Sequence, residues 1–134
     1  MSLDTPEQQL ADQIKADNAG WIVLDYPDKP KQVSKGKPFV AVFRASIVPA
    51  GNRTMLDHEL KVNVFASKQT GEGAAAELRE ILDGVMLSIE RYVGGSFKRA
   101  DLKVFDEVYL GWDIDVTVTS ENIYRSAVQL ERSN

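Results

Sequence analysis

Residues 71–76, Gly-Glu-Gly-Ala-Ala-Ala, come nearest to a known chemical motif, because they follow an expected strand and open an expected helix. A Gly-x-Gly-x-x-Ala spacing lets the backbone approach the pyrophosphate of a dinucleotide. Three features oppose that interpretation. The preceding strand alternates, whereas strands of a doubly wound sheet are apolar throughout. Glu72 would place a negative charge against the pyrophosphate, and 134 residues are too few for a dinucleotide fold plus a substrate domain. We therefore favour a loop and a helix N-terminus, and we expect no cofactor.

His58 is the only histidine of the chain, which also contains no cysteine. Disulfides and thiolate metal sites are therefore excluded. His58 lies on the apolar side of an alternating strand, and no nucleophile or positioned partner can be named for it. We interpret it as a partly buried structural histidine bonded to a neighbouring strand, and we expect neither a catalytic residue nor a metal site.

Asp113 and Asp115 lie on one face of a later strand, about 7 Å apart at roughly 3.3 Å per residue. Two carboxylates at that spacing could act as acid and base or hold a divalent ion. Thr117 and Thr119 continue the same face, which is typical of a solvent-facing polar surface. We favour that surface, followed by a contact with a partner and then by catalysis.

The strongest structural pattern in the sequence is an amphipathic helix over residues 73–93. Gly94 and Gly95 end it, because glycine readily adopts the left-handed conformation of a helix C-cap. Spacings of three and four place its apolar residues on one stripe, which needs a sheet to cover it. These residues are Leu78, Ile81, Leu82, Val85, Met86, Ile89, Tyr92 and Val93.

Shorter elements surround this helix. A capping box of Thr5 and Gln8 begins an N-terminal helix that ends near Asn18. Alternating or apolar runs predict strands over residues 21–24, 39–48, 56–66, 102–110 and 112–119. We expect a loop over 27–38, a hairpin between the second and third strands, a loop over 97–100, a bulge or bend at Asp106 and Glu107, and a bend or turn at Gly111. The polar tail, residues 120–134, adds a last strand or stays mobile until a neighbour orders it.

These elements predict an α+β fold in one domain, residues 1–134. A single mixed or mostly antiparallel sheet of four to five strands carries the short N-terminal helix and the long helix on one face. The length allows a substantial core. No apolar run is long enough to cross a membrane, and the first residues do not resemble a signal peptide.

The charged residues are distributed unevenly, although the net charge is only −4. Lysines gather in the proline-rich loop over 27–38, and acidic residues gather late in the chain. They form either two solvated faces or complementary patches that meet across copies of the protein. On charge and loop character, the predicted interface residues are Lys29, Lys31, Lys35, Lys37, Arg53, Asp106, Glu107, Asp113 and Asp115.

The order and texture of the elements resemble the tail-terminator proteins of long, non-contractile-tailed bacteriophages. The resemblance covers nearly the whole chain and is one of pattern rather than of sharp motifs. It is carried by a short helix leading into residues 21–27, the Pro- and Lys-rich loop, strands at 38–42, 57–65 and 111–118, and the long helix over 75–89. Head-completion and connector proteins share much of this pattern.

The resemblance implies a virion protein, assembled in the host cytoplasm, that forms a hexameric ring at the head-proximal end of the tail. Such a ring caps the tail tube, ends its polymerisation and offers a surface to the head connector. Its partners would be itself, the tail tube protein and the head connector protein, with DNA passing through the lumen unbound. The family has no catalytic residues and no cofactor. Two alternatives stay open: a head–tail connector or head-closure ring, and a small cytoplasmic ligand-binding domain or enzyme.

Overall fold

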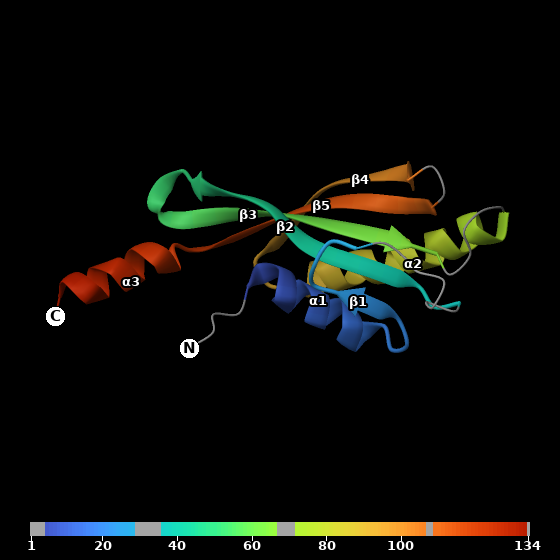
Figure 1. The fold of residues 1–134 in the computed structure, drawn as a ribbon, viewed down its shortest axis with the longest axis horizontal. Coiled ribbons are helices and arrows are strands. Elements are labelled where there is room, and N and C mark those ends of the chain that lie inside the picture. Colours follow the sequence, from blue (N-terminus) through green and yellow to red (C-terminus); the bar gives the residue numbers. More distant parts are fainter. Residues whose placement is uncertain (1–4, 29–35, 67–71, 107–108, 134) are drawn as a thin grey trace.

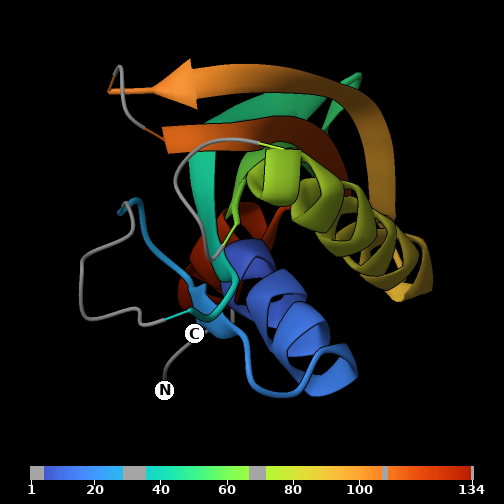
Figure 2. The ribbon, with the colours of Figure 1, turned by 90° about the vertical axis from the view of Figure 1, so that its right-hand side faces the viewer.

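The computed structural model describes residues 5–28, 36–66, 72–106 and 109–133. It contains one mixed sheet of five strands, in the order β1-β2-β3-β5-β4, with two helices on one of its faces (Figures 1 and 2). The predicted α+β class is therefore confirmed. The elements are α1 (Pro6–Asp17), β1 (Ile22–Leu24), β2 (Phe39–Ala50), β3 (Asn52–Phe65), α2 (Glu72–Arg91), β4 (Gly95–Phe105), β5 (Tyr109–Glu121) and α3 (Ile123–Arg132).

The sheet is mostly antiparallel, because only the short strand β1 runs parallel to its neighbour β2. The predicted hairpin of β2 and β3 is present and turns at Gly51, whose φ of +79° favours glycine. The pairing of β2 shifts its register between Arg44 and Ser46. Beyond this bulge the hairpin continues past the helices, so that residues 45–55 are mostly exposed.

The core lies between the sheet and the helices α1 and α2. The predicted stripe of α2 is buried through Leu78, Ile81, Val85 and Ile89, which pack on alternate residues of the strands. Helix α1 begins at the predicted capping box, in which Thr5 Oγ1 accepts from the Gln8 backbone and Gln8 Oε1 accepts from the Thr5 backbone. The two helices touch each other as well as the sheet.

A small aromatic cluster occupies part of the opposite face of the sheet. The Phe65 ring meets Phe105 edge-on at a centroid distance of 4.9 Å, with Phe39 at 6.0 Å and Tyr109 at 6.2 Å. Phe65 and Phe105 converge beside Gly111, where an added Cβ would lie 2.5 Å from the Val64 carbonyl oxygen. The sheet therefore has buried apolar residues on both faces at this end, although helices cover only one of them.

Three sequence-based expectations for the second half of the chain are wrong. Residues 97–100 are part of the edge strand β4 rather than a loop. The expected strand over 102–110 is two strands, because Asp106 takes a φ of +51° after β4 and begins the turn into β5. Gly111 lies inside β5 rather than at a bend, paired with Phe65 and Lys103.

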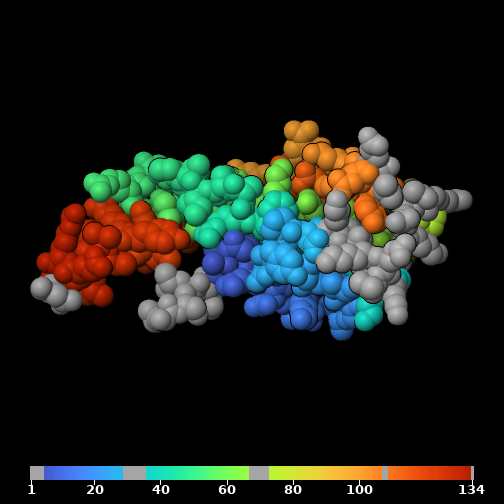
Figure 3. All heavy atoms as spheres, in the orientation of Figure 1, coloured from blue at the N-terminus to red at the C-terminus, as the bar shows by residue number. Residues whose placement is uncertain are grey.

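The C-terminal tail is the largest departure from expectation, because it forms the helix α3 rather than a strand or a mobile segment. Helix α3 lies beside the end of the β2–β3 hairpin, at one extremity of the longest axis of the molecule (Figures 1 and 3). None of its residues is buried. We call residues 45–55 together with α3 the arm.

Candidate functional site

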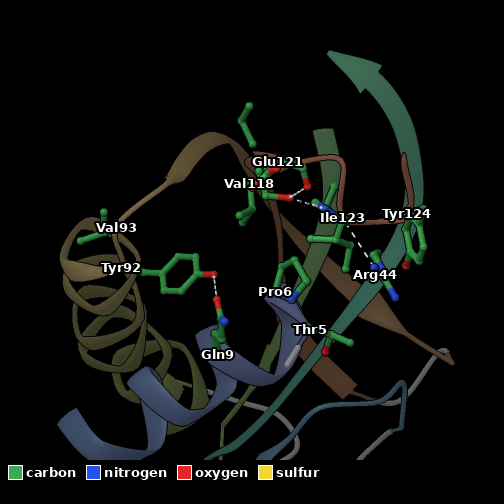
Figure 4. A pocket seen from close by; sticks show the side chains of 13 residues that line it. Thr5, Pro6, Gln9, Arg44, Tyr92, Val93, Val118, Glu121, Ile123 and Tyr124 are labelled. Carbon is green, nitrogen blue, oxygen red and sulfur yellow. Dashed lines mark hydrogen bonds between the residues drawn. The ribbon is translucent and has the colours of Figure 1, made fainter. Parts of the chain in front are cut away.

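A cavity of about 410 Å³ lies at the base of the arm, where the start of α1, the end of α2, β3, β5 and the first turn of α3 meet (Figure 4). Its apolar lining comes from Pro6, Val93, Val118 and Ile123. Across the cavity, the Tyr92 hydroxyl donates to Gln9 Oε1 at 2.6 Å and joins α2 to α1. Burial raises the pKa of Tyr92, so this hydroxyl keeps its proton and stays a donor.

A chain of polar groups forms the other side of the cavity and links α1 to three strands. Glu7 Oε2 lies 3.2 Å from Arg44 Nε, Arg44 Nη1 lies 3.2 Å from His58 Nδ1, and His58 Nε2 lies 2.8 Å from Ser120 Oγ. A guanidinium only donates hydrogen bonds, so His58 Nδ1 must accept and Nε2–H must donate to Ser120. The expected bond from His58 to a neighbouring strand is present, and the residue is 4% exposed.

This arrangement decides what chemistry His58 can perform. Its Nδ1 lone pair is occupied by Arg44, and its Nε2 carries the proton that faces Ser120. The imidazole therefore has no free nitrogen to take a proton from the serine, as a Ser–His dyad would require. The polar chain positions α1, β2, β3 and β5 relative to one another at the base of the arm.

The burial of His58, reinforced by the Arg44 charge, lowers its pKa below the usual value. Well above the ordinary histidine pKa of about 6.5, the ring is neutral in both the folded and unfolded states and contributes no pH dependence. As the pH falls through that value, the unfolded chain binds a proton that the folded chain resists, so stability falls. We expect urea midpoints to drop between pH 7.5 and 5.5, and His58→Gln to flatten this drop while costing about 1 kcal/mol at pH 7.5. An equal drop in the variant would contradict this role.

The paired carboxylates Asp113 and Asp115 lie on the sheet face away from the helices and are bound by lysines of the same sheet. Lys61 Nζ lies 2.6 Å from Asp115 Oδ1 and 3.6 Å from Asp113 Oδ2, and Lys103 Nζ lies 2.9 Å from the same Asp113 oxygen. The hydrogen bond to Asp115 raises the pKa of Lys61, which is thus held in its charged form. These ion pairs connect β3, β5 and β4 across the sheet.

The predicted interface residues that the structure describes lie on separate parts of the subunit. Arg53 lies in the arm, far from Asp113. Asp113 pairs with Asn63 of β3, and Arg53 and Asn63 are ten residues apart on that strand, which is about 33 Å at 3.3 Å per residue. Lys37 is exposed before β2, and Asp106 is exposed in the turn after β4. Lys29, Lys31, Lys35 and Glu107 lie outside the described residues.

A second hollow, of about 420 Å³, lies within the arm between the hairpin and α3 and was not predicted. Its lining is formed by Arg53, Asn122, Tyr124, Arg125, Val128, Gln129 and Arg132. We call it the arm groove. Its lining combines three arginines with the side chains of Tyr124 and Val128, and no acidic residue lines it among the residues described.

Asn122 builds the arm groove by joining α3 to the hairpin. Its backbone N–H donates to the Thr54 carbonyl at 2.8 Å, and its Nδ2 donates to the Arg53 carbonyl at 2.9 Å. Its Oδ1 accepts from the Arg125 N–H at 3.1 Å and so caps the first turn of α3. The helical spacing of Ile123, Ala127 and Leu130 was the sequence signal that could have revealed α3.

No model of a known protein family matches this sequence, and no curated protein is significantly similar to it. Among the described residues, no three potential metal ligands of the His, Cys, Asp and Glu types gather into one cluster. The helices in the described part of the chain include none with the length and apolar content needed to cross a membrane.

Proposed function

We propose that this protein is a structural virion subunit that closes into a ring at the head-proximal end of a phage tail tube. The ring would end polymerisation of the tube protein and offer its other face to the head connector. The observation that carries this proposal is the arm, which extends from the body of the subunit and in which no residue of α3 is buried.

The composition of α3 supports a partner chain. A ten-residue helix is marginally stable in water without tertiary packing. Helix α3 nevertheless exposes a row of apolar residues, and the hairpin beside it exposes Ile47 and Val48. The exposed apolar residues of α3 are Ile123, Tyr124, Val128 and Leu130. Large apolar groups gathered on a projection are typical of a protein–protein contact.

The position of the arm supports a ring. Because the arm lies at one extremity of the subunit, it can meet a different surface of a neighbouring copy (Figure 1). Contacts between two unlike surfaces produce a ring when the rotation closes. The resemblance of the element order to tail terminators suggests six subunits in the ring, with the tail tube protein and the head connector protein as partners. It also suggests assembly in the host cytoplasm and a lumen through which DNA passes unbound.

Tube growth in vitro tests this proposal. We expect purified tail tubes grown with the protein to be shorter and capped at one end by a ring in electron micrographs, compared with tubes grown alone. A control with equal mass of serum albumin should leave tube length unchanged. Binding to purified portal complexes and not to tubes would favour a head–tail connector ring instead. Tubes of unaltered length with bare ends would contradict the terminator function.

The cavity at the base of the arm favours a second class of function, a small cytoplasmic ligand-binding domain or enzyme. Its volume is within the range of small-molecule sites, and Arg44 and Tyr92 supply polar groups. This alternative requires a shift in melting temperature with a nucleotide or a divalent ion. A screen of these ligands that shifts nothing would remove it.

A further inference from the structure

We propose that the arm groove receives the outward face of helix α2 from a second copy of this chain. The inference rests on the proposed ring and names the two surfaces that would build it. One surface is basic and includes Tyr124 and Val128, and the other is acidic with a single exposed leucine. They lie on different parts of the subunit, as a head-to-tail contact requires.

The arm groove is positively charged, and no acidic side chain of the described residues neutralises its arginines. In the described part of the chain, the guanidinium groups of Arg53, Arg125 and Arg132 form no ion pair. Arg125 and Arg132 are seven residues apart on α3, about 10 Å at 1.5 Å per residue, and thus lie two turns apart on one side of the helix. Tyr124 and Val128, which are 52% and 43% exposed, line the groove with them.

The outward face of α2 has the opposite character. Glu80, Asp83, Leu87 and Glu90 follow one another at spacings of three, four and three, so they form one row along the helix. Leu87 is 55% exposed, and the three carboxylates form no ion pair with any other described residue. The row is about 15 Å long at 1.5 Å per residue, about the length of the ten-residue helix α3.

Docking this row into the groove would pair three carboxylates with three arginines and cover Leu87 with Tyr124 and Val128. Both charge sets would then be partly withdrawn from water next to their counterions, where ion pairs contribute more than on an open surface. The exposed edge of β4 is a weaker candidate for the same groove. Its apolar residues Leu102 and Val104 lie beside Asp101 and Lys103. Because these two residues carry opposite charges, this edge has no net negative charge to attract the arginines of the groove.

Charge reversal tests the pairing. We expect Arg125→Glu with Arg132→Glu to weaken self-association at least tenfold by sedimentation, and Glu80→Arg with Glu90→Arg to do the same. A chain with all four changes should regain assembly, because each altered groove then meets a matching altered helix. The control Lys15→Glu with Lys98→Glu reverses two exposed lysines outside both surfaces and should assemble normally. Circular dichroism must show that every variant is folded.

A disulfide trap gives an independent readout, because the chain has no cysteine of its own. Oxidising a mixture of Val128→Cys and Leu87→Cys chains should produce a linked dimer, whereas Val128→Cys with Leu102→Cys should not. Assembly that withstands charge reversal, or absence of the trapped dimer in an assembled sample, would overturn the inference.

The outcomes separate this inference from the proposed function. If the unaltered protein assembles and caps tubes while the charge variants do the same, only the docking surface is wrong. If the unaltered protein never assembles or caps tubes, the ring itself is wrong. The arginine variants can also be compared with the unaltered protein for binding to a single-stranded oligonucleotide. If they lose this binding but still assemble, the groove is a phosphodiester site and the docking of α2 into it is overturned.

Discussion

Gly111→Val is expected to leave the chain largely unfolded at room temperature, and Gly111→Ala to cost about 3 kcal/mol or more. An added Cβ would lie 2.5 Å from the Val64 carbonyl oxygen and 3.1 Å and 3.2 Å from the rings of Phe65 and Phe105. The carbonyl belongs to the neighbouring strand β3 and cannot turn away without breaking the pairing of the sheet. Relief would separate β3 from β5 or spread the aromatic cluster.

Urea unfolding followed by circular dichroism measures this effect. The matched control is Gly73→Ala, an exposed position in the first turn of α2, where alanine should leave the midpoint unchanged or raise it. A Gly111→Ala chain that unfolds at the same urea concentration as the unaltered protein would show that β3 and β5 are not packed as described.

A chain ending at Asn122 is expected to fold like the intact protein and to stay monomeric. Helix α3 buries no residue of its own, so its removal takes little packing from the body, and the change in unfolding free energy should be within about 1 kcal/mol. Asn122 remains and keeps its bonds to the hairpin. Self-association should be lost, because the arm groove and the apolar side of α3 disappear together.

Sedimentation and thermal unfolding test the two parts of this prediction separately. A chain ending at Arg132 retains α3 and should assemble like the intact protein. Unfolding of the shorter chain would mean that α3 supports the body, and unaltered assembly would mean that the arm is not the contact.

Local signals in the sequence were sufficient for much of the fold. Thr5 and Gln8 form a capping box within four residues, and the stripe of α2 repeats over five turns, so neither needs information from distant residues. The alternation of residues 56–66 likewise predicted a strand covered on one face. The sheet with two helices on one side followed from these local patterns.

The second half of the chain depended on contacts that local patterns do not encode. Phe97 and its neighbours are mostly exposed because β4 is an edge strand, so their sequence has the polarity of a loop. Gly111 is typical of a bend in isolation, and only the approach of the Phe65 and Phe105 rings explains it within a strand. The division of residues 102–110 followed from the backbone of Asp106, whose left-handed conformation begins a turn.

The candidate site was the least predictable part for the same reason. The sequence places Arg53 seventy-two residues from Arg125 and gives no sign that Asn122 brings them to one groove. It also presents Asp113 and Asp115 as unpartnered, whereas Lys61 and Lys103 reach them from neighbouring strands. Their contribution to a contact between subunits stays a prediction.

The central claim is that this chain is a subunit of a homo-oligomeric ring, and the mass of the intact protein in solution at low and high salt tests it most directly. We expect a ring at low salt, or a monomer that becomes a ring on tail tubes. We also expect weaker association at high salt, because screening reduces the attraction between the arm groove and α2. A protein that stays monomeric at every concentration and salt, and is inert toward tubes, would contradict the account.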